Sequence, residues 1–295
     1  MISVNNLTVK YKSGKGIFGL NFTVKEGEVF GFLGPNGAGK TTTIRSLMGF
    51  MPADAGSCKI GGIDCWSGAK DIKEFLGYIS GEIAFFDNMT GNEFLKFLTD
   101  MRGKKDGGRQ AQLTEYFQLD ARGSIRRMSK GMKQKLGIIA AFMHDSKVLI
   151  LDEPTSGLDP LMQNKFVQLV LEEKKRGKTV LMSSHSFDEI DKTCDRAGII
   201  KDGKMQAVES ISTLKASQKK IYSVVFDKKA DMQSLKEQGF ELKNEYENTA
   251  EISIVGEADA LIKALAKYRV ISLDRKSQDL ESVFMQYYDN REEAE

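Results

Sequence analysis

The sequence predicts an α/β protein with a layered core of parallel strands, followed by a smaller α+β domain. Apolar, strand-like runs recur at 148–152 and 179–184 with a helix-like segment between them, which is typical of a parallel sheet. The composition changes near 216–220, and short elements then follow in the order β-α-β-β-α-β, the ferredoxin-like arrangement. We therefore place the two domains at 1–217 and 218–295.

The first domain begins with strands and becomes helical in its middle. Short strands are expected at 2–9, 17–24 and 28–33, before a first helix at 40–49. Residues from about 85 to 145 are expected to form a mostly helical subdomain.

Two capping signals mark helix starts. The segment TGNE from Thr90 to Glu93 has the spacing of a capping box and precedes an amphipathic stretch. Asp159 stands before Pro160, as a helix N-cap followed by proline at the first helical position, so a helix is expected over 160–177.

The second domain is expected to contain six short elements and a final helix. Its strands are expected at 221–227, 240–246, 250–256 and 269–275, and its helices at 231–239 and 258–268. A last helix at 278–288 has apolar residues at helical spacing and is expected to dock back on the protein.

The bulk composition is that of a reduced, soluble protein. The chain has 43 basic and 41 acidic residues, so its charge of +2 gives no argument for a nucleic-acid partner. Cys58, Cys65 and Cys194 lack C-x-x-C spacing, which indicates a reducing compartment without a structural zinc or disulfide. No signal peptide and no run near the roughly 18 apolar residues of a membrane span is present.

The segment GPNGAGKT at 34–41 fits the phosphate-binding pattern G-x-x-x-x-G-K-[ST]. It follows an apolar strand and opens a helix, as the motif requires. Its glycines let backbone N–H groups point at phosphate, Lys40 is expected to reach the β- and γ-phosphates, and the Thr41 hydroxyl is expected to bind Mg²⁺. The expected ATP-binding residues are Gly34, Pro35, Asn36, Gly37, Ala38, Gly39, Lys40, Thr41 and Thr42. Tyr11 is expected either to stack on adenine or to pack in the core.

Two adjacent carboxylates end the buried strand-like run VLILDEP. Ligands of open α/β sheets bind at the carboxyl ends of parallel strands, so Asp152 is expected to hold Mg²⁺ there. Glu153 is placed to polarise the attacking water. His185 follows another apolar strand and is expected on the same edge, either in contact with the γ-phosphate or as an ordinary surface histidine.

The stretch from Arg126 to Phe142 places lysines in the first turns of a helix. A helix N-terminus carries about half a positive charge, so lysines there disfavour the helix unless an anion binds. The bare N–H groups at Ser129 and Gly131, with Lys130 beside them, therefore predict an anion-binding helix start.

Taken together and in this order, GPNGAGKT, MSKGM, LILDEP, SGLD and SSH resemble the ATP-binding cassette of ABC transporters over about residues 1–215. SKGMKQKL and the ending LESVFMQYY are most similar to ATPase subunits of ABC-2-type bacterial exporters, and exporters of small amphipathic peptides such as phenol-soluble modulins are one closer match. The resemblance implies a P-loop NTPase cassette with a RecA-like core, an antiparallel β subdomain and a helical subdomain.

The resemblance also implies partners and further roles. Two ATPase subunits, identical or different, would pair head to tail around ATP and Mg²⁺ and drive a separate membrane permease. They would lie in the cytoplasm, on the inner face of the membrane. The signature residues, which would bind the partner's ATP, are Ser129, Lys130, Gly131 and Met132. The loop that would touch the second subunit is Ser156, Gly157, Leu158 and Asp159.

This sequence departs from the family pattern at two places. Lys130 and Met132 replace a glycine and a glutamine of the usual signature. Gly81 stands where the family usually has a Mg²⁺-binding glutamine, so the neighbouring Glu82 becomes a candidate metal ligand.

Two other functions remain to be weighed. A soluble ABC ATPase acting on DNA would need a long coiled coil, but only 88 residues separate Lys40 from Ser129. A ribosome-acting member usually carries two cassettes, and this chain has one. The region 220–290 could instead bind a ligand that regulates the cassette. Phe85 and Phe86 are expected either on a permease-docking surface or in the core.

Overall fold

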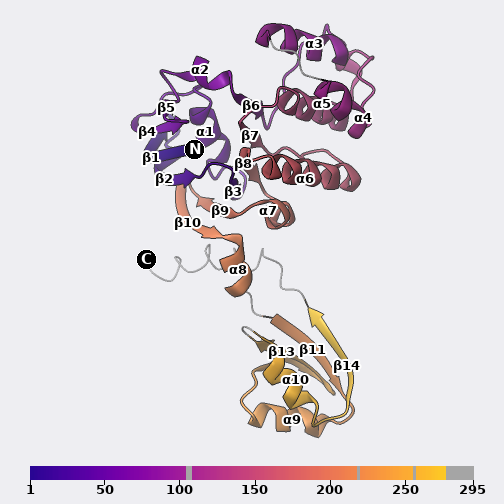
Figure 1. Ribbon diagram of the computed structural model, residues 1–295. Helices are drawn as coiled ribbons and strands as arrows, with labels where there is room; N and C mark the ends of the chain where they lie inside the picture. The colour runs from indigo at the N-terminus through magenta and orange to yellow at the C-terminus, as the bar shows by residue number, and fades with distance from the viewer. Residues whose placement is uncertain (104–107, 218–219, 255–256, 277–295) are drawn as a thin grey trace. The chain divides into compact units, whose positions relative to one another are not determined.

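The computed structural model of the chain describes residues 1–103, 108–217, 220–254 and 257–276. The chain divides into two compact units, Met1–Glu209 and Ser210–Glu295 (Figure 1). The second unit begins at Ser210 rather than at the predicted residue 218, so the short helix α8 (Ile211–Ser217) is counted with it.

The first unit alternates strands and helices along the chain. Its elements are β1 (Ile2–Lys10), β2 (Gly16–Val24), β3 (Val29–Leu33), α1 (Lys40–Leu47), β4 (Ala55–Ile60), β5 (Ile63–Asp64), α2 (Ala69–Lys73), β6 (Leu76–Ile79), α3 (Gly91–Arg102), α4 (Arg109–Tyr116), the 3₁₀ turn η1 (Ile125–Arg127), α5 (Lys130–Phe142), β7 (Val148–Asp152), α6 (Pro160–Lys175), β8 (Thr179–Ser184), α7 (Phe187–Thr193), β9 (Arg196–Lys201) and β10 (Lys204–Ser210).

The larger sheet of this unit has the strand order β10-β9-β3-β8-β7-β6. The strands β9, β3, β8, β7 and β6 run parallel. Every residue of β3, β7 and β8 is buried, as expected for parallel strands covered on both faces. The register pairs Leu33 with Ser184 and Asp152 with Ser183, so the carboxyl ends of these strands meet at one edge.

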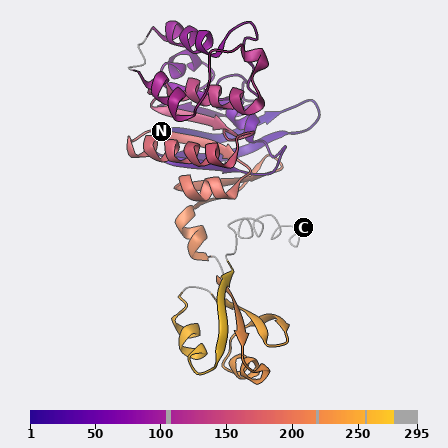
Figure 2. The same cartoon turned by 90° about the vertical axis from the view of Figure 1, so that its right-hand side faces the viewer.

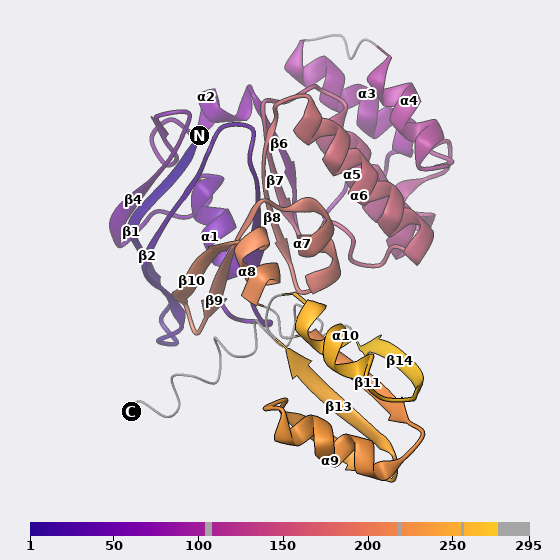
Figure 3. The ribbon, with the colours of Figure 1, turned by 60° about the horizontal axis from the view of Figure 1, so that its bottom comes forward.

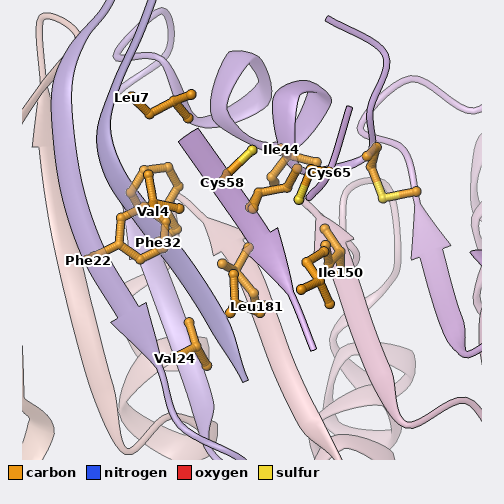
Figure 4. Packing of buried hydrophobic residues seen from close by; sticks show 14 of the residues in the cluster. Val4, Leu7, Phe22, Val24, Phe32, Ile44, Cys58, Cys65, Ile150 and Leu181 are labelled. Carbon is orange, nitrogen blue, oxygen red and sulfur yellow. The ribbon is translucent and has the colours of Figure 1, made fainter. Parts of the chain in front are cut away.

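A second, antiparallel sheet has the order β2-β1-β4-β5. Buried and exposed residues alternate along β2, which is the pattern of a sheet with one face on a core. Helix α1 lies between the two sheets (Figure 3). The core in this layer joins Phe22 of β2, Phe32 of β3, Ile44 of α1 and Ile150 of β7 (Figure 4).

Helices α6 and α7 lie side by side on one face of the larger sheet (Figures 1 and 2). Helices α3, α4 and α5 form the predicted helical region. Its capping box is confirmed: the Thr90 N–H donates to Glu93 Oε2 at 2.7 Å, and the Glu93 N–H donates to Thr90 Oγ1 at 3.2 Å. The predicted cap of α6 is confirmed too, because Asp159 Oδ1 accepts the Met162 N–H at 3.0 Å.

A buried ion cluster joins α4 to α6. Glu173 is only 1% exposed, and Arg109 Nη2 of α4 lies 2.7 Å from Glu173 Oε1. Arg176 and Lys178 lie 2.8 and 2.9 Å from the same carboxylate. A buried carboxylate needs such partners, since an unpaired charge in the interior is costly. The cluster therefore anchors the helical region on the sheet-bearing part of the first unit.

The second unit contains the predicted ferredoxin-like order. Its elements after α8 are β11 (Lys220–Phe226), α9 (Lys229–Glu237), β12 (Leu242–Tyr246), β13 (Thr249–Ile254), α10 (Asp259–Leu265) and β14 (Val270–Lys276). The sheet order is β12-β13-β11-β14, with antiparallel pairs throughout. Val224, Phe226, Leu235, Ile252 and Leu261 form its core. The helix predicted at 278–288 lies outside the described residues.

Candidate functional site

The phosphate loop leaves the end of β3 and enters α1 at Lys40. Gly39 has φ of 111°, a left-handed value that favours glycine, and a Cβ there would lie 2.6 Å from Ile17 Cγ2. A Cβ on Gly34 would lie 2.4 Å from the Ile200 carbonyl oxygen. Both glycines are therefore required by backbone angle or by close packing, which explains the pattern seen in the sequence.

Lys40 is the first residue of α1 and is 5% exposed. Its Nζ donates to the Gly34 carbonyl at 2.6 Å and to the Pro35 carbonyl at 3.2 Å. The same Nζ lies 3.6 Å from Glu153 Oε1. The lysine ammonium is thus held inside the curve of the loop, where it can meet a phosphate.

Asp152 ends β7 and is completely buried. Its Oδ1 accepts a hydrogen bond from Ser183 Oγ at 2.5 Å, whereas Oδ2 has no hydrogen-bond partner among the described residues. A Cβ placed on Gly81 would lie 3.1 Å from this Oδ2. A buried carboxylate oxygen without a donor is suited to a cation, so this side chain fits a metal ion.

The described part of the chain contains no group of three or more His, Cys, Asp or Glu side chains able to enclose a metal. Mg²⁺ does not need such a group, because it is usually bound by one or two carboxylates together with substrate phosphates and water. Asp152 therefore matches the kind of site that a nucleotide-bound Mg²⁺ requires.

Glu153 has φ of 46°, a left-handed value that costs a non-glycine residue about 1–3 kcal/mol. Its N–H donates to Ser183 Oγ at 3.0 Å and lies 3.2 Å from the Ser183 carbonyl oxygen. The single Ser183 hydroxyl thus joins Asp152 to Glu153. Glu153 Oε2 lies 3.4 Å from Nδ1 of His185, whose side chain is 65% exposed. The structure therefore brings Lys40, Asp152, Glu153 and His185 to one edge.

The signature segment lies at the start of α5. Ser129 is exposed and is the N-cap, with its Oγ accepting the Met132 N–H at 3.2 Å. A Cβ on Gly131 would lie 3.0 Å from the Gly157 carbonyl oxygen. The Lys130 stem covers Gly157, since a Cβ on Gly157 would lie 3.0 Å from Lys130 Cγ. The signature segment and the loop 156–159 of the same chain are therefore packed together.

Two other predicted residues lie at the surface. Tyr11 follows β1 and is 37% exposed, so its alternative placement in the core is wrong. Its hydroxyl lies 3.2 Å from Thr42 Oγ1, which places it beside the phosphate loop. Glu82 is exposed and forms no hydrogen bond or ion pair within the described ranges. Gly81, its neighbour, is the residue that faces Asp152.

An open pocket of about 860 Å³ is lined by residues of α2, β6, α3 and α5. Its apolar lining includes Phe85 and Phe94, whose rings meet edge to face at 5.0 Å. Lys73 and Arg102 add positive charge to the rim. Phe86 is 55% exposed beside it, so the expectation that both phenylalanines lie in the core is wrong for Phe86.

Sequence reasoning missed two buried side chains that hold this site. Ser183 stands inside an apolar strand, and Gln134 lies inside the helix α5, where its Nε2 donates to the Pro154 carbonyl at 2.6 Å. The available signal was their polarity within otherwise apolar segments, because a buried polar side chain needs a partner.

Comparison with known proteins matches this architecture. Residues 17–156 match the ABC transporter family. The linearmycin resistance ATP-binding protein LnrL of Bacillus subtilis (strain 168) is 38% identical over 213 residues, which are 70% of this chain and 68% of LnrL. The bacitracin transport ATP-binding protein BcrA of Bacillus licheniformis is 35% identical over 250 residues, which are 84% of this chain and 81% of BcrA. A solved structure of the ATP-binding subunit of an ABC transporter has a TM-score of 0.68 at 28% identity, covering 73% of this chain and 92% of that one.

Proposed function

The chain belongs to the ABC transporter family as an ATP-binding subunit, and from this premise we propose that it hydrolyses ATP to drive export through a separate membrane permease. The relatives support export as the direction, since one is named for linearmycin resistance and another for bacitracin transport. Two copies would pair around two ATP molecules and separate after hydrolysis.

The observation that carries the proposal is the meeting of Lys40, Asp152 and Glu153 at one sheet edge. Lys40 supplies a cation for the β- and γ-phosphates. Glu153 Oε1 lies 3.6 Å from the Lys40 Nζ, so a carboxylate stands beside the place where the transferred phosphate would be held. A carboxylate in that position acts as a general base on the attacking water.

Mg²⁺ completes the proposed site. Asp152, through the Oδ2 that has no hydrogen-bond partner in the described part of the chain, and the Thr41 hydroxyl would hold it, and Glu82 remains a candidate ligand. When bound, Mg²⁺ neutralises charge on the β- and γ-phosphates. His185, on the other side of Glu153, would donate a hydrogen bond to the γ-phosphate, and Tyr11 would stack on adenine.

The signature segment would bind the nucleotide of the second copy. Ser129 is exposed at the N-terminus of α5, and the backbone N–H groups of Lys130 and Gly131 belong to the first turn. A helix N-terminus with lysines nearby attracts a phosphate. The residues 156–159, which pack against this segment, would contact the partner at the same interface.

The open pocket beside α3 is the proposed permease-docking site. Its apolar lining carries three basic side chains, Lys70, Lys73 and Arg102, against one acidic side chain, Glu74, and so fits an amphipathic segment with acidic residues. None of the described helices is both long enough and apolar enough to cross a bilayer. Docking of the permease at this pocket would hold the chain at the inner face of the cell membrane, which is its proposed place.

Two measurements test the proposal. The purified chain should hydrolyse ATP in a Mg²⁺-dependent manner, and a chain that binds no ATP would contradict it. Co-purification with its membrane permease from the source cells should yield a complex that Met101→Asp weakens, since Met101 lines the pocket and is 69% exposed. Leu161→Asp, an apolar position outside the pocket that is 62% exposed, is the matched control and should leave the complex intact.

A further inference from the structure

Gln134 connects the signature helix to the backbone that carries Glu153. It lies in the second turn of α5 and is 5% exposed. Its Nε2 donates to the Pro154 carbonyl at 2.6 Å, and this bond is buried. Pro154 follows Glu153 directly and has no N–H, so its carbonyl is the only backbone group of that residue that a side chain can bind.

The backbone around Glu153 needs to be held from both sides. Its left-handed φ of 46° persists only when the surrounding structure fixes it. On the N-terminal side, the Ser183 hydroxyl accepts the Glu153 N–H at 3.0 Å. On the C-terminal side, the Gln134 amide holds the next carbonyl, and the Ser156 N–H donates to the Glu153 carbonyl at 3.2 Å.

The same helix touches this loop at a second point. The virtual Cβ of Gly131 lies 3.0 Å from the Gly157 carbonyl oxygen, and the Lys130 stem is equally close to a Cβ built on Gly157. Contacts at Pro154 and Gly157 therefore fix the segment 154–157, which follows Glu153, to helix α5. A displacement of the signature segment must move the loop with it, or break the buried Gln134 bond.

We propose that Gln134 is a positioning residue, which couples the place of the signature segment 129–132 to the orientation of Glu153 in the same chain. The inference rests on the proposed function, because it takes Glu153 as the base and the signature segment as the contact to the partner's ATP. When the signature segment of one copy closes on the partner's nucleotide, Gln134 aligns the base for that copy's own nucleotide. Binding at the partner's nucleotide is thereby coupled to hydrolysis at the copy's own nucleotide.

Gln134→Met tests this role, because methionine has nearly the length of glutamine and lacks the N–H donor. We expect kcat to fall by about 10–100-fold, because a displacement of about 1 Å at the reacting groups can lower the rate by as much as about 100-fold. KM for ATP should stay close to that of the unaltered protein, since Lys40 and the phosphate loop are untouched. Gln112→Met, at an exposed position of α4, is the matched control. If Gln134→Met raised KM without lowering kcat, the proposal would be overturned.

A double variant with Glu153→Gln separates a purely structural role of Gln134 from a role in positioning Glu153. There the base is already absent, so adding Gln134→Met should not lower the residual rate further, and the ATP-dependent dimer should still accumulate. An additional 10–100-fold loss in the double variant would show that Gln134 acts independently of Glu153 and would overturn the proposal. If Gln134→Met does not fold, Gln134→Asn serves both tests, because its amide is one methylene too short to reach Pro154.

The outcomes also separate this inference from the proposed function. Unchanged turnover in Glu153→Gln would refute Glu153 as the base, on which this inference rests, but not the proposed function, which would be refuted by a chain that binds no ATP. An inactive Glu153→Gln together with full kcat in a folded Gln134→Met would overturn the role of Gln134 alone.

Discussion

Lys40 Nζ lies 3.6 Å from Glu153 Oε1. The cation that we propose for the phosphates and the carboxylate that we propose for the attacking water are therefore neighbours. Lys40 also donates to the Gly34 and Pro35 carbonyls, so its charge is shared among three oxygens. An entering phosphate carries more charge than these groups, so it would compete with them for the ammonium. The other Glu153 oxygen, Oε2, lies 3.4 Å from His185 Nδ1.

Glu153→Gln should bind ATP and hydrolyse it very slowly. The amide keeps the shape of the side chain but cannot accept a proton, so a general-base contribution of about 10²–10⁴-fold is lost. The variant should accumulate as an ATP-bound dimer, measurable by size-exclusion chromatography with light scattering. Glu115→Gln, on the exposed face of α4, is the control. Turnover at the rate of the unaltered protein in Glu153→Gln would remove Glu153 from the mechanism.

Ser183→Ala should impair both stability and catalysis. It removes the donor to Asp152 Oδ1 and one of the two acceptors of the Glu153 N–H, whose other acceptor is the Ser183 carbonyl. The carboxylate oxygen of Asp152 is then buried without its donor, and an unsatisfied buried group costs about 1–3 kcal/mol. Ser184→Ala is the matched control, because Ser184 is also buried but donates to Glu189 Oε2 at 2.6 Å. Urea unfolding should show losses for both variants, whereas only Ser183→Ala should lower kcat. Equal kcat values for the two variants would contradict a role for Ser183 at the site.

Asp145→Asn should change the acid limb of the stability curve. The hydrogen bond from Lys178, aided by Arg176, holds the pKa of Asp145 below its ordinary value against the opposing effect of burial. A depressed folded-state pKa stabilises the protein above the unfolded pKa of about 3.9 and loses that effect as pH falls through the folded pKa.

The stability difference between the unaltered protein and Asp145→Asn should therefore be full at pH 7 and vanish in acid. Asparagine tolerates the left-handed φ of 56° at this position, so backbone strain is not introduced. Urea unfolding at a series of pH values measures the difference. Two parallel curves down to pH 3 would show that the ion pair does not contribute.

The helices and strands that have a clear pattern within a short stretch of sequence could be predicted from the sequence alone. Strands β3, β7 and β8 are continuous apolar runs, and α3 and α6 carry their own caps, so each was predictable from a short window. Strand β6 was not, because LGYI is four residues long and contains glycine; its pairing with β7 makes it a strand. The same holds for β9, which begins with Arg196 and depends on β3.

Some residues of the candidate site could likewise be predicted from local sequence, and others could not. The phosphate loop and the carboxylates of Asp152 and Glu153 are local motifs, and their chemistry is visible in the sequence. Ser183 lies 31 positions from Asp152, and Gln134 lies 20 positions from Pro154, so nothing local indicates their hydrogen bonds. The approach of Gly81 to Asp152 likewise depends on the pairing of β6 with β7.

A chain ending at Glu209 should fold and bind ATP. The core of the two sheets and α1 lies within residues 2–200, and the second unit has a separate core. Units with their own hydrophobic cores usually fold independently. A cooperative thermal transition and fluorescent-nucleotide binding measure the result, with the full chain as control. An insoluble product from both this truncation and one ending at Ser217 would mean that the first unit needs the second.

The last prediction asks whether the phosphate that we propose to bind at Ser129 belongs to the nucleotide of a second chain. Lys40→Ala removes the cation that we propose for the β- and γ-phosphates. Ser129→Asp places a carboxylate where the γ-phosphate would lie, while aspartate can still cap α5 as serine does. A side chain at Gly131 is a poorer choice, because its Cβ would lie 3.0 Å from the Gly157 carbonyl oxygen of its own chain. Ser129→Asn keeps the cap without the charge and is the control.

Each variant alone should form an inactive homodimer, because both of its sites carry the same defect. Consider a mixed dimer of one Lys40→Ala chain and one Ser129→Asp chain. If each signature segment binds the nucleotide of the other chain, one site contains both substitutions and the other site contains neither. ATPase activity should then return, measured on dimers purified through two different tags, provided that one site can turn over. If each signature segment served its own chain, every site would keep one defect and mixing would restore nothing. As a control, a dimer of one unaltered and one variant chain should be active. If that control is active and the mixed dimer is inactive, the prediction that the signature segment binds the nucleotide of the second chain is wrong.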